Sequence, residues 1–175
     1  MMRLDASAWL NGAAPATDGK VVAVHAFQML CPGCVAHGIP QAMKMQQVFP
    51  ELVVTGLHSV FEHHDVMTPQ ALEVFIHEYR LPFPVAVDRL VPGSPVPATM
   101  QHYALRGTPS LLLFDRGGRL RLNHFGSIDD MVLGGVIGRL LAEPPGSLAK
   151  DGAGACGAQP SDGAACDANG CARRG

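Results

Sequence analysis

The fold is decided by the stretch Lys20-Val-Val-Ala-Val-His-Ala-Phe27 and by the motif Cys31-Pro32-Gly33-Cys34, which follows after three residues. The first stretch is almost continuously apolar and rich in β-branched residues, which is typical of a strand buried on both faces of a sheet. From residue 35 to 49 apolar residues recur near helical spacing, and Pro40 is expected to kink this helix without abolishing it. The two cysteines are therefore expected between the end of a buried strand and the N-terminus of a helix.

The rest of the chain predicts further strands and helices in alternation. A helix is expected after Thr68, which would be its N-cap, with Pro69 at the first helical position. Ser127 and Asp130 resemble a capping box at the start of a last helix. Strands are expected over 51–58, 83–87, 110–114 and 119–125, the last two forming an antiparallel hairpin, and a short helix over 98–104. This order predicts an α/β sandwich with parallel and antiparallel strands.

Composition excludes several classes of partner. The 175 residues include 13 basic and 15 acidic side chains, for a net charge of −2, without a long run of either sign. The sequence thus indicates no basic patch that would bind a nucleic acid or an anionic membrane. No apolar stretch approaches the roughly 20 residues that span a bilayer. The first nine residues lack the apolar core of a signal peptide, so a cytoplasmic protein is expected, or a periplasmic one if a leader has been removed.

The chain is expected to divide near residue 142. Residues 1–142 predict one globular domain, whereas the composition of 143–175 changes to Pro, Gly, Ala, Ser and Asp, which predicts a flexible tail. The tail carries Cys156, Cys166 and Cys171. These thiols could relay electrons to or from the Cys31-Cys34 pair, capture a soft metal ion, or be incidental.

The spacing of the cysteines favours redox chemistry. A Cys-x-x-Cys pair at a helix N-terminus places its first sulfur over free backbone N–H groups, which stabilise a thiolate. Cys31 is then the nucleophile, and Cys34 attacks the mixed disulfide that forms at Cys31. The alternative is half of a zinc site, but the predicted domain offers no second Cys/His pair at short spacing. The segment 63–65, His-His-Asp, is expected to be a solvated loop and not a metal site, and neither a metal nor another cofactor is expected.

Three motifs in order resemble the thioredoxin-like redoxins, specifically the TlpA and alkyl-hydroperoxide-reductase/thiol-specific-antioxidant branch. They are the segment 21–34 with its Cys-Pro-Gly-Cys, the segment 75–88 ending in Leu-Pro-Phe-Pro-Val-Ala-Val-Asp, and the segment 103–120, which contains Arg-Gly-Thr-Pro-Ser. The resemblance covers most of residues 18–142 and implies a thioredoxin-like three-layer α/β/α sandwich with a mixed central sheet. It also implies a cis-proline beside the dithiol at Pro109, with Thr108 hydrogen-bonding an extended substrate strand.

The chain departs from the family pattern at three positions. Leu30 replaces the usual aromatic residue before the first cysteine, and Pro40 falls one residue later than the usual helix proline. His25 occupies the place where thioredoxins have a buried Asp that relays a proton to and from the second cysteine. An imidazole could do the same, or His25 could be a buried histidine satisfied by hydrogen bonds.

The leading hypothesis is a thiol-disulfide oxidoreductase in which Cys31, Cys34, Thr108, Pro109 and His25 form the site. It would cycle the dithiol against a protein or low-molecular-weight disulfide and take electrons from a thiol donor. One alternative is a thiol-dependent peroxidase with Cys31 as the peroxidatic cysteine, although Gln28 and Val24 stand where peroxiredoxins have a hydroxyl residue and a proline. The other alternative is a metal-binding or metal-delivery module that uses Cys31, Cys34 and the tail cysteines.

Overall fold

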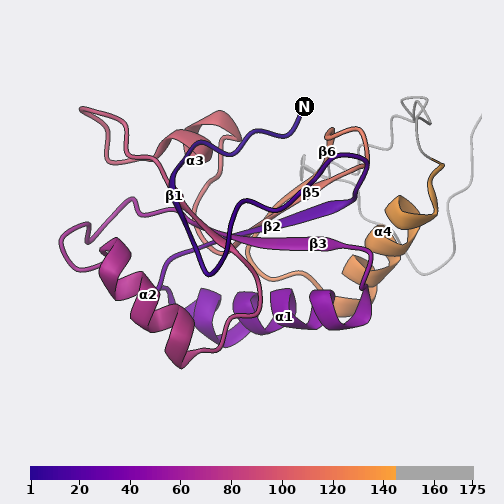
Figure 1. The fold of residues 1–175 in the computed structure, drawn as a ribbon, viewed down its shortest axis with the longest axis horizontal. Coiled ribbons are helices and arrows are strands. Elements are labelled where there is room, and N and C mark those ends of the chain that lie inside the picture. The colour runs from indigo at the N-terminus through magenta and orange to yellow at the C-terminus, as the bar shows by residue number, and fades with distance from the viewer. Residues whose placement is uncertain (145–175) are drawn as a thin grey trace, which may run out of the picture.

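A computed structural model describes residues 1–144 of the chain. Its centre is a mixed sheet of six strands in the order β1-β4-β3-β2-β5-β6 (Figure 1). The strands are β1 (Ala6–Leu10), β2 (Val22–Phe27), β3 (Val53–His58), β4 (Val85–Asp88), β5 (Ser110–Phe114) and β6 (Leu120–Phe125). The helical elements are the π-turn η1 (Cys34–Gly38), α1 (Ile39–Val48), α2 (Pro69–Glu78), α3 (Ala98–His102) and α4 (Asp130–Ala142).

The strand that precedes the dithiol lies in the middle of the sheet. β2 pairs in parallel with β3 and antiparallel with β5, and every one of its residues is buried. β4 continues the parallel pairing next to β3, while β1 and β6 form the two antiparallel edges. The continuous apolar run of β2 is explained by this position, because both faces of a central strand are covered.

Helices cover both faces of the sheet, as the predicted three-layer sandwich requires. In Figure 1, α1 and α2 lie below the sheet and α3 lies above it, while α4, at the right, shares the core of the α1 face. The lower core gathers Ala23 and Phe27 of β2 with Ile39, Leu72 and Leu133 from α1, α2 and α4. The upper core is smaller and joins alternate residues of the strands to α3 and to the N-terminal segment. No helix in the described part of the chain is long and apolar enough to cross a membrane.

Most expected elements are present, with three corrections. β1 was not predicted, because the segment Ala-Ser-Ala-Trp-Leu is a short edge strand that only its pairing with β4 defines. Thr68 does cap α2, accepting a hydrogen bond from the Ala71 N–H at 3.2 Å. The predicted capping box of α4 is wrong, since the side chain of Asp129, and not Ser127, accepts from the N–H groups of Met131 and Val132. The third correction is the form of the kink before Pro40, described with the site below.

Candidate active site: the Cys31-Cys34 dithiol

Cys31 and Cys34 lie where the sequence predicts them, between the end of β2 and the first helical turn. Among the described residues neither forms a disulfide; Cys31 is partly exposed and Cys34 is completely buried. The N–H of Cys34 donates to the Cys31 sulfur over 3.2 Å, and the N–H of Val35 donates to the Cys31 carbonyl over 3.1 Å. The outer sulfur therefore faces a backbone donor at the helix start, which favours negative charge there.

The two thiols differ in their electrostatic surroundings. Burial raises the pKa of Cys34 to about 12, and a hydrogen bond with Cys31 acts in the same direction. Hydrogen bonds from the Gln28 backbone and the Thr108 side chain lower the pKa of Cys34, but they do not offset burial. Cys34 consequently keeps its proton near neutral pH and needs a base before it can attack a disulfide.

Thr108 and Pro109 lie directly beside the dithiol. The Thr108–Pro109 bond is cis, as the resemblance implied. The Cys31 thiol donates to the carbonyl oxygen of Thr108 over 3.5 Å, across 77 positions of sequence. A Cβ placed on Gly33 would lie 3.4 Å from the Pro109 ring, so the helix start and the proline are in close contact. The expected juxtaposition of residues 31–34 with 108–109 is therefore confirmed.

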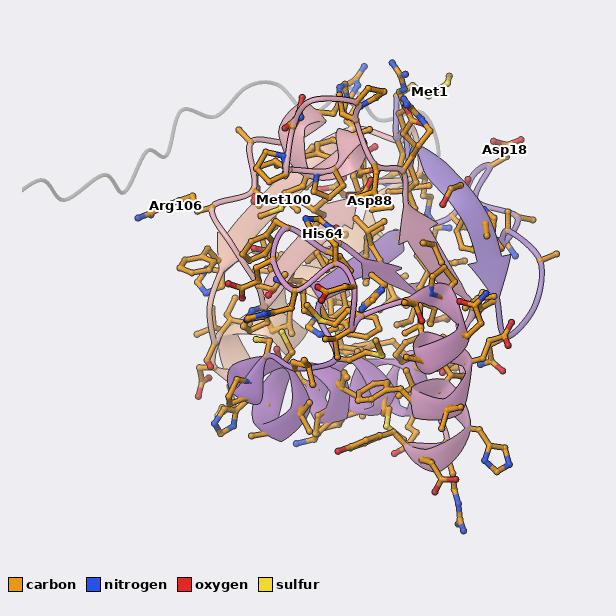
Figure 2. All side chains as sticks on the ribbon, turned by 90° about the vertical axis from the view of Figure 1, so that its left-hand side faces the viewer. Met1, Asp18, His64, Asp88, Met100 and Arg106 are labelled. Atoms are coloured by element: carbon orange, nitrogen blue, oxygen red, sulfur yellow. The ribbon has the colours of Figure 1, made fainter. Side chains whose placement is uncertain are left out.

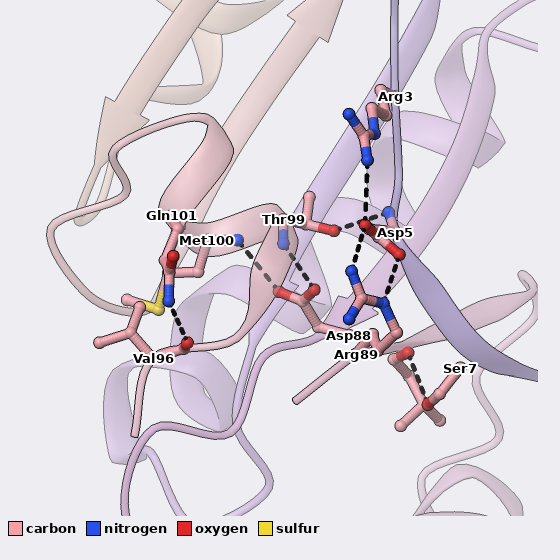
Figure 3. Close-up of polar contacts among 10 residues, drawn as sticks. Arg3, Asp5, Ser7, Asp88, Arg89, Val96, Thr99, Met100 and Gln101 are labelled. Atoms are coloured by element: carbon pink, nitrogen blue, oxygen red, sulfur yellow. Dashed lines mark hydrogen bonds and ion pairs between the residues drawn. The ribbon is translucent and has the colours of Figure 1, made fainter. Parts of the chain in front are cut away.

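A polar network around Asp88 holds in place the segment that leads to Pro109 (Figure 3). The Asp88 carboxylate accepts from the backbone N–H groups of Thr99 and Met100 at 2.8 and 3.1 Å. It also accepts from the Ser59 hydroxyl at 2.8 Å. Asp88 thereby fixes the start of α3 against the ends of β3 and β4, and the chain runs from α3 to Pro109. In the sequence this aspartate ends the segment 75–88, and no local pattern predicts its positioning role.

The helix after the dithiol begins with a π-turn, which explains the late position of Pro40. The N–H of Ile39 donates to the carbonyl of Cys34, five residues back, instead of four. A π-turn holds one more residue than an α-turn, and Pro40 itself has no N–H to donate. The expected kink is thus a wide turn over residues 34–38, and the regular helix α1 starts at Ile39.

His25 is buried beneath this π-turn and has an unsatisfied nitrogen. Its side chain is 4% exposed, its ring stacks on Phe27 at 5.9 Å, and its Nε2 has no hydrogen-bond partner among residues 1–144. Gly38 fits closely over the ring: a Cβ there would overlap His25 Cε1 and lie 2.7 Å from Nε2. Burial lowers the pKa of His25 to about 4. The imidazole is therefore neutral at pH 7, and the expectation of a histidine satisfied by hydrogen bonds does not hold for Nε2.

A groove of about 360 Å³ reaches His25 from the surface. One wall is the π-turn with the start of α1, the other is the β6–α4 connection, and Pro109 lies at the groove as well. Lys44 and Asp130 form an ion pair of 2.6 Å across it. The groove gives the buried imidazole a route to solvent, which a group that exchanges protons requires.

Other residues considered from the sequence lie apart from this site. The loop residues His63, His64 and Asp65 are exposed, as expected, and Figure 2 shows His64 on the loop in front of the sheet. Within residues 1–144, no three His, Cys, Asp or Glu side chains are grouped closely enough to hold a metal ion. Cys156, Cys166 and Cys171 lie outside the described residues. Arg106 and Phe125, which lie next to the segment that leads into Thr108–Pro109, were not predicted from the sequence.

Comparison with solved structures identifies the family. A thiol-disulfide isomerase from Corynebacterium glutamicum is 53% identical, with a TM-score of 0.79, over 82% of this chain and 96% of that chain. A thioredoxin-like superfamily protein is 49% identical with the same TM-score, 0.79, over 81% of this chain and 96% of its own. A thioredoxin-like protein in the oxidized form, at 23% identity and a TM-score of 0.64, covers 79% of this chain and 91% of its own and supports the fold alone. No protein-family model and no curated protein matches the chain.

These relationships define a class of protein, the thiol-disulfide oxidoreductases of thioredoxin fold. The chain belongs to the thioredoxin-like superfamily, and its general chemistry is thiol-disulfide exchange.

Proposed function

We propose that the chain is a dithiol reductase or disulfide-exchange enzyme of the TlpA-like branch, cycling Cys31-Cys34 against a protein or small-molecule disulfide. The observation that carries this proposal is the asymmetry of the pair. Cys31 is accessible, with its sulfur 3.2 Å from the Cys34 N–H, whereas Cys34 is fully buried behind it. An accessible nucleophile backed by a protected second thiol is the arrangement that two-step disulfide exchange needs.

The reaction conserves atoms and electrons in two displacements. The Cys31 thiolate attacks one sulfur of the substrate disulfide, and the other substrate sulfur leaves as a thiolate that takes up a proton. Cys34 then loses its proton and attacks the Cys31 sulfur of the mixed disulfide, which releases the second substrate thiolate. The protein ends as a Cys31-Cys34 disulfide, two electrons have passed to the substrate, and an external thiol donor restores the dithiol.

Three residues support these steps in the proposal. His25 accepts the Cys34 proton and passes it to solvent through the groove, because its imidazole is neutral at pH 7, too weak a base to keep the proton, and its Nε2 has no partner among residues 1–144. Thr108 acts on both thiols: its carbonyl accepts from the Cys31 thiol, and its side chain lowers the pKa of Cys34. Pro109 packs against the helix start at Gly33, which keeps the substrate-facing backbone next to the reacting sulfur.

Parallel assays of insulin reduction and peroxide consumption, with the same thiol reductant, test this function. We expect insulin reduction that requires Cys31 and falls strongly in Cys34→Ser, with little peroxide consumption above the reductant alone. Peroxide consumption that exceeds disulfide reduction and survives Cys34→Ser would instead support the peroxidase. Stoichiometric metal in the purified full-length protein, lost in Cys31→Ser, would support the metal-binding module.

A further inference from the structure

Two exposed apolar side chains lie at the end of the sheet that carries the dithiol. Leu30, immediately before Cys31, is 57% exposed, and Phe125 is 45% exposed. Phe125 pairs in the sheet with Ser110, the residue that follows Pro109, so its ring lies at the same end of the sheet as the dithiol. The ring packs against Gly107: a Cβ there would lie 2.9 Å from Phe125 Cε2. Leu30 and Phe125 therefore border the surface on which a disulfide must approach Cys31, and we call it the docking surface.

Arg106 adds a positive charge to the docking surface. Its guanidinium carbon lies 5.7 Å from the centroid of the Phe125 ring, a cation–π distance. The ring supports the guanidinium from one side, and Figure 2 shows Arg106 pointing away from the body of the molecule. Arg3, Arg89 and Arg121 each form an ion pair, but within residues 1–144 Arg106 forms none. The Arg106 guanidinium thus lies two residues before Thr108–Pro109 and is available to pair with an anionic group of a substrate.

We propose that Arg106 selects protein disulfides whose cysteine is flanked by an acidic side chain next to an apolar one. The apolar residue packs on Leu30 or Phe125, and the carboxylate pairs with the Arg106 guanidinium while the substrate sulfur meets Cys31. The planar guanidinium suits a carboxylate because it donates two parallel hydrogen bonds. This inference rests on the proposed function, since it names the substrate class of the same site.

The test uses three peptides that differ at one position. Each carries Leu-Xaa-Cys, with Xaa as Glu, Gln or Lys, and its cysteine forms a mixed disulfide with 5-thio-2-nitrobenzoate, whose release is followed by absorbance. The second-order rate constant is measured for the reduced full-length protein at low and at high salt. We expect the order Glu, Gln, Lys, with steps of about two- to fivefold at low salt that shrink at high salt.

Two variants separate the role of Arg106 from a general effect of charge. Arg106→Glu should reverse the order of the three peptides. Arg119→Glu is the matched control, because Arg119 is also exposed but lies at the other end of the β5–β6 hairpin. It changes the net charge equally and should leave the order intact. Circular dichroism and the thermal midpoint confirm that both variants are folded.

The outcomes distinguish this inference from the proposed function. If the peptides react but their order is the same in the wild type and Arg106→Glu, the selection by Arg106 is wrong while disulfide exchange stands. If both glutamate variants flatten the order equally, the preference belongs to the whole molecule and not to Arg106. If no peptide reacts faster than with Cys31→Ser, both the inference and the proposed function are wrong.

Discussion

At the scale of single residues, the raised pKa of Cys34 predicts a difference in reactivity between the two thiols. Burial raises that pKa to about 12, so Cys34 has almost no thiolate at neutral pH, whereas the Cys31 sulfur is accessible. We expect iodoacetamide to alkylate Cys31 well before Cys34 between pH 6 and 9 in the reduced protein. Peptide mass spectrometry at several times gives both rates, and equal or faster labelling of Cys34 would overturn the assignment of roles.

The two buried histidines predict a dependence of stability on pH. Burial lowers the pKa values of His25 and His58 from 6.5 to about 4. Between those pH values the unfolded chain binds more protons than the folded one. The stability that the two neutral histidines contribute is therefore complete above pH 6.5 and is lost as the pH falls towards 4. Each histidine should change the free energy of unfolding by about 1.4 kcal/mol per pH unit within this window.

Urea unfolding between pH 7 and 4.5 measures this slope. As the pH falls, the free energy of unfolding of the wild type should decrease with a slope close to that of two protons taken up on unfolding. In His25→Gln the slope should be smaller by about one proton. The lowered pKa values of carboxylates such as Asp5, which its hydrogen bond with Arg89 brings to about 2, act mainly below this window. A slope that is the same in the wild type and in His25→Gln would show that His25 is not held neutral by the fold.

At the scale of elements, the fit of the π-turn over His25 predicts opposite effects for two glycine substitutions. A Cβ at Gly38 would overlap the His25 ring and lie 3.1 Å from Pro109 Cβ, so Gly38→Ala should cost about 1–3 kcal/mol. In α4, Gly138 is exposed with nothing within 4 Å of its Cβ position, so Gly138→Ala should stabilise by about 0.4–1 kcal/mol. Urea denaturation measures both, and a neutral Gly38→Ala would mean that the turn is loosely packed.

The elements also show how far sequence patterns extend. Local patterns predicted three features correctly: the buried strand β2, the position of the dithiol at the start of a helix, and the cap of α2 at Thr68. β1 could not be predicted, because five residues with mixed exposure become a strand only when β4 provides the hydrogen bonds. The contact of Arg106 with Phe125 was equally hidden, since it joins residues from different elements. The contact of Cys31 with Thr108–Pro109 joins two distant segments and was predicted only because the family resemblance implied it. The wrong capping box of α4 shows that a local pattern can also mislead.

At the scale of the whole molecule, the division of the chain into a domain and a tail stays a prediction. Both apolar cores and the ion pair of Arg121 with Glu143 lie within the first 144 residues, so the chain cut after Pro144 should fold alone. We expect its thermal midpoint and its insulin reduction with dithiothreitol to match those of the full chain. A large drop in the midpoint would show that residues 145–175 contribute to the folded domain.

A trapping experiment tests the hypothesis of a relay through the tail cysteines. Cys34→Ser leaves Cys31 without its resolving partner, so a tail thiol that exchanges with Cys31 should accumulate as a mixed disulfide. Proteolysis under acidic, thiol-blocking conditions and mass spectrometry would identify Cys156, Cys166 or Cys171 as that partner. If Cys31 is recovered only free or joined to an added small thiol, the relay has no support.

The π-turn also affects how the chain should be compared with its relatives. An α-helix advances about 100° per residue, so one additional residue would rotate every later side chain of α1 away from the sheet. Residues 34–38 confine the surplus residue to a single wide turn, and Ile39, Ala42 and Met45 still face the core. Alignments with relatives whose helix proline comes one residue earlier should therefore place their gap inside 34–38. A gap placed after Pro40 would put the helix out of phase and pair core positions with solvent-facing ones.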